Sequence, residues 1–333
     1  MEERTTTDLA ITGSIVIEQE KEPDLGEDAT ISLAIPGSKA SLFACLDGCG
    51  GSGARQYPAA NNRTGAWLAS RVCGHALNDW FKANSMKELG MQGYAAGVIA
   101  SSMKQALDES LFNAKQALGK TESVIISRLI KEFPTTLAAV LLEQTDPNKV
   151  RCLYLWAGDS RGFLFTTNGL RQMTVDDVIG NLDPHENLRK DGILSNVISL
   201  GGHYELRTNE IYVDAPCMAI TATDGCFSYY SSPIELEGIL LYTLMAAKNI
   251  NDWERQLTEQ MGEFAADDYT MQIAIIGFQT FDQLQRAYLP RTKEFREKYG
   301  KPLEQMKQAE DWAGMEQLWM KYKVFYMTEE SNG

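Results

Sequence analysis

The sequence has 333 residues, of which 44% are hydrophobic, and its 45 acidic side chains outnumber 31 basic ones to give a formal net charge of -14. This length allows one large domain or two small ones, with a buried core that needs no disulfide bonds. A strongly acidic chain repels phosphate backbones and anionic lipid. The composition therefore argues against general binding of nucleic acid or of a membrane surface.

The sequence also points to a cytoplasmic protein. No apolar run approaches the roughly 20 residues that span a bilayer, and the first residues lack the apolar stretch of a signal peptide. The six cysteines contain no C-x-x-C pair. We therefore expect them to be reduced and mostly buried.

Apolar alternation with β-branched residues predicts strands, and apolar residues at three-to-four spacing predict helices. In chain order we expect strands at 12–17, 30–35 and 41–46, helices at 65–81, 94–118 and 121–133, strands at 136–143, 152–157, 161–166, 210–213 and 218–223, helices at 233–248 and 251–264, and a strand at 270–278. Runs of strands alternate with pairs of helices. This order favours an α+β protein with two helix-covered sheets over a doubly wound parallel sheet.

The composition changes after residue 280. Residues 281–333 carry equal numbers of acidic and basic side chains, so the whole net charge lies in residues 1–280. We predict one domain at 1–280 and a C-terminal helical extension at 281–333. Its apolar residues recur at three-to-four spacing and are expected to form a stripe docked on the domain, the alternative being a helix that contacts a partner. The stripe residues are Trp312, Met315, Trp319, Tyr322 and Tyr326.

Acidic residues stand at the ends of several predicted strands, often beside a glycine. An acid at the mouth of a buried strand is costly unless its charge is compensated. Several such acids converging at sheet ends would suit Mg²⁺ or Mn²⁺, which prefer oxygen ligands. The sequence has no zinc-type spacing of His and Cys and no G-x-S-x-G nucleophile motif. The acids are Glu27, Asp28, Asp47, Asp159, Asp224, Asp267 and Asp268.

Taken in order, the segments around these acids resemble the metal-dependent serine/threonine protein phosphatases of the type 2C or PPM family. The matching segments are GEDA (26–29), LDGCGG (46–51), PTTLAAVLL (134–142), WAGDSRGFLF (156–165), RQMTVDD (171–177), NVISLGG (196–202), TATDGCFS (221–228) and DDYT (267–270). They cover about residues 10 to 280. The resemblance implies a four-layer αββα sandwich of two mainly antiparallel sheets flanked by helix pairs, with a metal centre at one end.

The resemblance also implies a site for two Mn²⁺ or Mg²⁺ ions. Asp47 would bridge the ions, and Asp47 and Asp28 would be the catalytic residues. Water held between the ions would attack the phosphate of phosphoserine or phosphothreonine directly, so no protein nucleophile is needed. The implied ligands are Asp47, Gly48, Asp224, Asp267, Glu27 and Asp28.

Two acidic positions have less regular counterparts in the family. Asp159 resembles a ligand of a third, weaker metal, but Ser228 stands where its usual partner acid would be, so the resemblance does not imply a complete third site. Asp268 replaces the family's asparagine, and its charge would either tighten metal binding or compete with it.

The family's usual phosphate-binding arginine is absent. Its position falls on Pro23, and Lys21 is the nearest cation. A lysine attracts phosphate as a point charge and lacks the two-pronged hydrogen bonding of arginine. Arg55 and Arg63, in a long segment at 52–63, are further candidates for this role. Cys49 occupies the position of a histidine that some members carry.

These features leave two hypotheses open. The first is a phosphoprotein phosphatase that opposes a Ser/Thr kinase, favoured by the retained acids Asp47, Asp224 and Asp267. The second is a catalytically impaired pseudophosphatase that serves as a binding or sensor module. The absent arginine, Cys49 and Ser228 favour the second hypothesis.

Overall fold

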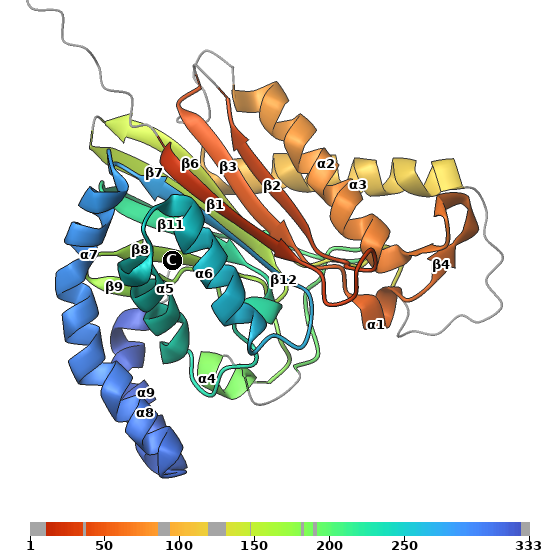
Figure 1. The fold of residues 1–333 in the computed structure, drawn as a ribbon. Coiled ribbons are helices and arrows are strands. Elements are labelled where there is room, and N and C mark those ends of the chain that lie inside the picture. Colours follow the sequence, from red (N-terminus) through yellow and green to blue (C-terminus); the bar gives the residue numbers. More distant parts are fainter. Residues whose placement is uncertain are drawn as a thin grey trace, which may run out of the picture.

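The computed structural model describes residues 11–35, 38–85, 94–118, 131–146, 148–180, 183–188 and 192–327. Its centre is a pair of five-stranded antiparallel sheets (Figure 1). One sheet has the order β1 (Ile11–Gln19), β12 (Tyr269–Ile276), β11 (Cys217–Ala222), β8 (Arg161–Thr166) and β9 (Gly169–Gln172). The other has the order β10 (Arg207–Asp214), β7 (Lys149–Ala157), β6 (Leu137–Asp146), β3 (Ala40–Leu46) and β2 (Ala29–Ala34).

Helices cover the outer face of each sheet (Figure 1). The β2-containing sheet is covered by α2 (Gly65–Ser85) and α3 (Ala96–Leu118), and the β1-containing sheet by α5 (Ile234–Ala246) and α6 (Ile250–Gly262). Three apolar clusters separate these layers, one between the sheets and one under each helix layer. The predicted αββα sandwich is therefore confirmed. The shorter elements are α1 (Gly50–Gly53), the hairpin β4 (Gln56–Tyr57) and β5 (Arg63–Thr64), and α4 (Pro184–Asn187).

The burial of each strand explains its sequence pattern. The central strand β6 is buried on both faces, and its apolar run is accordingly continuous. The edge strand β10 has one solvent-facing side, and its exposed and partly buried residues alternate. Every predicted strand is present, while β9 was missed because it is a four-residue partner of β8. Of the helix predicted at 121–133, residues 121–130 lie outside the described residues, and 131–133 are not helical.

The segment after residue 280 is helical, as predicted, and packs on the helix layer of the β1-containing sheet. It forms α7 (Phe281–Phe295), a π-helical turn (Arg296–Gly300), α8 (Lys301–Gln308) and α9 (Trp312–Tyr326). Met315, Trp319, Tyr322 and Tyr326 are buried in the same cluster as the core of that sheet. Most of the stripe is therefore docked, but Trp312 at its start is 57% exposed.

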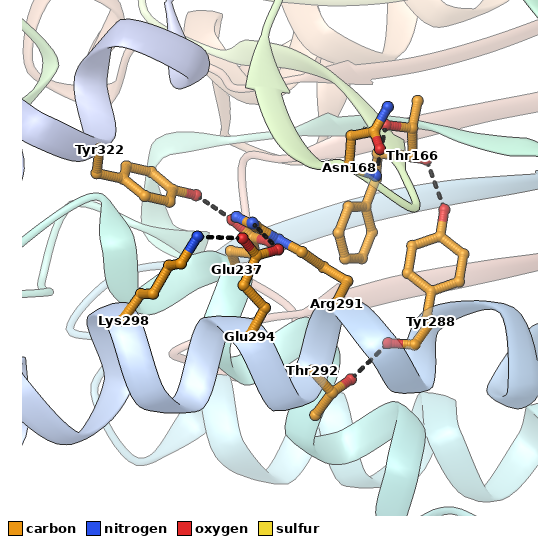
Figure 2. Close-up of polar contacts among 10 residues, drawn as sticks. Thr166, Asn168, Glu237, Tyr288, Arg291, Thr292, Glu294, Lys298 and Tyr322 are labelled. Atoms are coloured by element: carbon orange, nitrogen blue, oxygen red, sulfur yellow. Dashed lines mark hydrogen bonds and ion pairs between the residues drawn. The ribbon is translucent and has the colours of Figure 1, made fainter.

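A buried polar network joins three helices at this junction (Figure 2). Arg291 of α7 donates to both carboxylate oxygens of Glu237 of α5, at 2.7 and 3.1 Å, and the Tyr322 hydroxyl of α9 donates to the same carboxylate. Glu237 has no exposed surface. Because a buried carboxylate must be paired to be tolerated, these contacts fix how the extension sits on α5.

Within the described ranges, no helix combines the length and the apolar character that crossing a membrane requires. All six cysteines are unpaired, as expected, and only Cys49 among them is more than marginally accessible.

Candidate active site

Most of the acids singled out in the sequence line one open cavity of about 880 Å³. The register of the sheets brings them together. Ala222 at the end of β11 pairs with Met271 at the start of β12, so Asp224 and Asp267 lie at the same edge. The ladders from β3 through β6 to β7 likewise bring Asp47 and Asp159 to one edge. The acids lining the cavity are Glu27, Asp47, Asp159, Asp224, Asp267 and Asp268.

The backbone around Asp47 is fixed by the segment that leads into β6. The Asp47 carbonyl accepts hydrogen bonds from the Thr136 amide and the Thr135 hydroxyl, both at 2.8 Å. Gly48 follows where the chain passes close to α2, and a Cβ there would lie 2.6 Å from the carbonyl oxygen of Ala66. Only glycine fits this approach. The Asp47 carboxylate is thus presented to the cavity by a rigid strand end.

Acidic side chains outnumber basic ones in the described lining of the cavity, and several of these acids have raised pKa values. Burial, followed by the charges of Asp28 and Asp224, raises the pKa of Asp47 well above its usual value. Burial and neighbouring acids also raise the pKa of Asp224 to about 6 and that of Asp159 to about 8. Neighbouring negative charges disfavour ionisation, and a nearby cation would reverse this effect.

Asp28 lies just behind the cavity wall and is 5% exposed. The Thr223 hydroxyl donates to its Oδ2 at 2.8 Å, which ties the start of β2 to the end of β11. Burial, together with the charges of Asp224 and Asp268, raises the pKa of Asp28 to about 7 despite this hydrogen bond.

Asp268 has a role that the sequence did not reveal. Its Oδ1 accepts from the Lys21 amide at 2.8 Å, and its Oδ2 accepts from the Glu27 amide at 2.7 Å. A side chain near β12 therefore holds the segment before β2 against the cavity. The Glu27 carboxylate in turn accepts from the Thr64 hydroxyl.

No model of a known protein family matches this sequence, and no curated protein matches it in sequence. Solved structures are similar to its fold. Serine/threonine phosphatase Stp1 from Staphylococcus aureus is 17% identical, with a TM-score of 0.58 over 84% of this chain and 100% of that one. The catalytic domain of the phosphatase PstP, solved with two manganese ions, is 18% identical, with a TM-score of 0.53 over 80% and 98% of the two chains.

PppA, a regulatory component of the type VI secretion system in Pseudomonas aeruginosa, is also similar, at 18% identity and a TM-score of 0.53 over 81% of this chain and 99% of that one. The chain has the fold of the PPM-type serine/threonine phosphatases. At these identities the similarity establishes the fold, and any activity must be argued from the residues of the site.

Compared with the expected PPM-type pattern, the predicted phosphate-binding cations lie elsewhere. None of Lys21, Arg55 and Arg63 lines the cavity. Arg55 lies 3.9 Å from the Glu132 carboxylate, and Arg63 donates to a backbone carbonyl and stacks on the ring of Trp67. These contacts hold the side chains of Arg55 and Arg63 outside the lining of the cavity.

The cavity also contains residues that sequence reasoning missed. Lys131 lines it, beside Cys49 and Ser228, which had been singled out only as departures from the PPM-type pattern. One side of the cavity is apolar, and Ile193 there is 72% exposed. No short motif marks Lys131 or Ile193, because both come from loops that the fold brings to the cavity. The apolar side is formed by Leu188, Ile193, Leu194, Val197 and Tyr229.

Among the described residues, no three His, Cys, Asp or Glu side chains form a set with the geometry to hold a metal ion. The chemistry of the cavity nonetheless fits divalent cations, since its acids are numerous and oxygen-bearing and raise one another's pKa. The assignment of ligands is therefore part of the proposal below.

Proposed function

We propose that this protein is a metal-dependent phosphatase that hydrolyses phosphoserine and phosphothreonine in proteins, with two Mn²⁺ or Mg²⁺ ions as cofactors. The observation that carries the proposal is the gathering of six acids on one cavity of a PPM-type fold. The manganese in the PstP complex supports metal use by this fold.

The residues that would hold the ions come from separate segments. Asp47 and the Gly48 carbonyl would contribute from the end of β3, and Asp224 and Asp267 from the β11–β12 edge. Glu27 would contribute from the segment that Asp268 holds in place. Asp28, which is buried next to the cavity lining, would act on the ions from there. Asp159 would bind a third ion only weakly, because Ser228 replaces its usual partner acid.

Two bound divalent cations supply an activated water for direct attack and stabilise negative charge on the phosphoryl group. The chain's own part is to position these groups. The hydrogen bonds from the 135–136 segment fix the backbone of Asp47, and the Thr223 hydroxyl fixes the orientation of Asp28. The apolar side formed by Leu188, Ile193, Leu194, Val197 and Tyr229 offers a surface for the peptide that carries the phosphate.

A pseudophosphatase is the second candidate function. It is favoured by a specific observation: no arginine among the described residues lines the cavity. A binding or sensor module could keep the acids and still turn over no substrate.

Hydrolysis of p-nitrophenyl phosphate and of a phosphothreonine peptide distinguishes the two. We expect turnover with Mn²⁺ or Mg²⁺ that EDTA abolishes and that Asp47→Asn reduces at least 100-fold, about 2.7 kcal/mol of barrier. Circular dichroism of Asp47→Asn controls for folding. Turnover of the wild type no higher than that of Asp47→Asn would exclude the enzyme and leave the pseudophosphatase.

The partners follow from this proposal. The substrate would be a cytoplasmic phosphoprotein, phosphorylated by a Ser/Thr kinase that the phosphatase opposes. The C-terminal helices remain a possible contact for a partner, since Trp312 and Val324 of α9 are exposed. Nucleic acid and membranes are not expected partners because of the net negative charge.

A further inference from the structure

The described lining of the cavity carries far more negative than positive charge. Six carboxylates line the cavity, and Lys131 is the one basic side chain among its described lining residues. A phosphate monoester is itself an anion, so it meets repulsion from these acids unless cations face it. Besides any metal, Lys131 is the only described lining group that can provide such a charge.

The backbone fixes where Lys131 stands. Its amide donates to the Ser52 carbonyl at 3.1 Å, and three residues later the Pro134 carbonyl accepts from the Cys49 amide at 3.1 Å. Residues 131–136 thus run alongside residues 47–53, from Asp47 to the end of α1. Lys131 lies across from the glycine-rich segment that follows the proposed bridging ligand.

The charge of Lys131 acts on Cys49 in the cavity lining, where it opposes the rise in pKa that burial and the neighbouring acids cause. The ammonium group makes no hydrogen bond and no ion pair within the described part of the chain, although the residue is half-buried. The adjacent acid, Glu132, is occupied by Lys115, by Arg55 and by the Tyr57 hydroxyl. An unpaired, half-buried cation facing a cavity is ready to bind an anion.

We propose that Lys131 binds the phosphate group of the substrate, in the role first expected of Lys21, Arg55 or Arg63. This inference rests on the proposed function in that the ligand is a phosphate monoester. A lysine offers three donors from one ammonium group, so it can follow a phosphate without fixed two-pronged geometry.

The test measures binding rather than turnover. Isothermal titration calorimetry gives the affinity for Mg²⁺ alone and then for inorganic phosphate at saturating Mg²⁺. The variants are Lys131→Gln and Lys131→Arg. Lys82→Gln is the matched control, because Lys82 is exposed near the far end of α2, roughly 25 Å along the helix from Ala66, which lies against Gly48 of the cavity lining.

We expect Lys131→Gln to weaken phosphate binding about tenfold, the size of one charge-assisted hydrogen bond, while Lys131→Arg and Lys82→Gln bind within about threefold of the wild type. The affinity for Mg²⁺ should stay equal or rise in Lys131→Gln, because a positive charge has left an acidic cavity. Opposite changes in the two affinities distinguish a phosphate contact from a general disturbance of the site.

Several results would overturn the inference: no phosphate binding by the wild type, an unchanged phosphate affinity in Lys131→Gln, or loss of both affinities in Lys131→Gln and Lys131→Arg alike. Failure of the Lys131 contact and failure of the proposed activity give different results. If phosphate binding depends on Lys131 but the wild type hydrolyses no phosphopeptide, the activity is wrong and the contact stands. If Lys131→Gln binds phosphate and hydrolyses phosphopeptide as the wild type does, the contact is wrong and the activity stands.

Discussion

Replacing Arg291 by methionine tests whether the C-terminal extension is held by its buried polar network. The change removes the cation that pairs with Glu237 and keeps an unbranched side chain that fills the position up to about the Nε of the arginine. Glu237 is fully buried, and Arg291 is 7% exposed. Among the described residues, the Tyr322 hydroxyl is then the hydrogen-bond donor that remains to the Glu237 carboxylate.

The structure supplies a comparison for the expected magnitude. Breaking a buried pair by removing one partner costs about 3–5 kcal/mol, because an uncompensated charge is left behind. The pair between Lys301 and Glu297 has nearly the same length, 2.6 Å against 2.7 Å, but its side chains are 47% and 63% exposed. Lys301→Gln should therefore cost far less than Arg291→Met, because water screens an exposed pair.

Urea unfolding followed by far-UV circular dichroism measures both variants at pH 7. A third variant combines Arg291→Met with Glu237→Met and Tyr322→Phe, so that no polar group of the network remains. It should recover most of the lost stability, because an apolar replacement leaves no buried charge. A loss below about 1 kcal/mol in Arg291→Met, or a triple variant less stable than the single one, would refute the reasoning.

Three further predictions concern the cavity and the edge of the extension. Asp183 caps α4 and pairs with α9; burial would raise its pKa, but these hydrogen bonds lower it below the usual value. Asp183→Asn should therefore cost about 1 kcal/mol at pH 7 by urea unfolding. The cost should begin to shrink as the pH falls below about 4, where the unfolded carboxylate is protonated, and should vanish only below the lowered pKa of Asp183 in the folded protein; a loss independent of pH would contradict this. Gly225→Ala would place a Cβ 1.9 Å from the carbonyl oxygen of Asp268, whereas a Cβ on Gly51 meets nothing within 4 Å. Calorimetry should show a melting temperature many degrees lower for Gly225→Ala and nearly unchanged for Gly51→Ala, and equal shifts would rule out the steric account. Mn²⁺ at 100 times its dissociation constant should stabilise the wild type by about 2.7 kcal/mol in a thermal shift assay and Asp47→Asn by much less, and equal stabilisation of both would place the metal elsewhere.

The positions of the strands and of the acids at their ends were predictable because both are local properties of the chain. The continuous apolar run of β3 is followed by Asp47, and that of β11 by Thr223 and Asp224. Because burying an unpaired charge is costly, a charged residue after an apolar run predicts the end of a buried strand. Helix periodicity similarly indicated α5, α6 and most of the C-terminal extension. The resemblance added the four-layer sandwich and the expectation of a metal centre at one of its ends.

The positions of the basic side chains relative to the cavity could not be predicted from the local sequence. Arg55 and Arg63 follow the glycine-rich segment closely, and proximity in sequence favoured them as phosphate ligands. The hairpin β4–β5 turns them toward Glu132 and Trp67 instead. Lys131 is about 80 residues away from Asp47 along the chain, and only the hydrogen-bonded alignment of 131–136 with 47–53 brings it to the cavity.

The sequence by itself determined the order of strands and helices, the excess of acid in residues 1–280, and the acids that end the buried strands. The tertiary structure decided which charges meet. It assigned Asp268 to hold the segment before β2, buried Glu237 against Arg291, left Trp312 exposed, and made Lys131 the basic lining residue of the described cavity. The physical reason is that apolar periodicity acts over a few residues, whereas the pairing of charges depends on contacts between segments far apart in the chain.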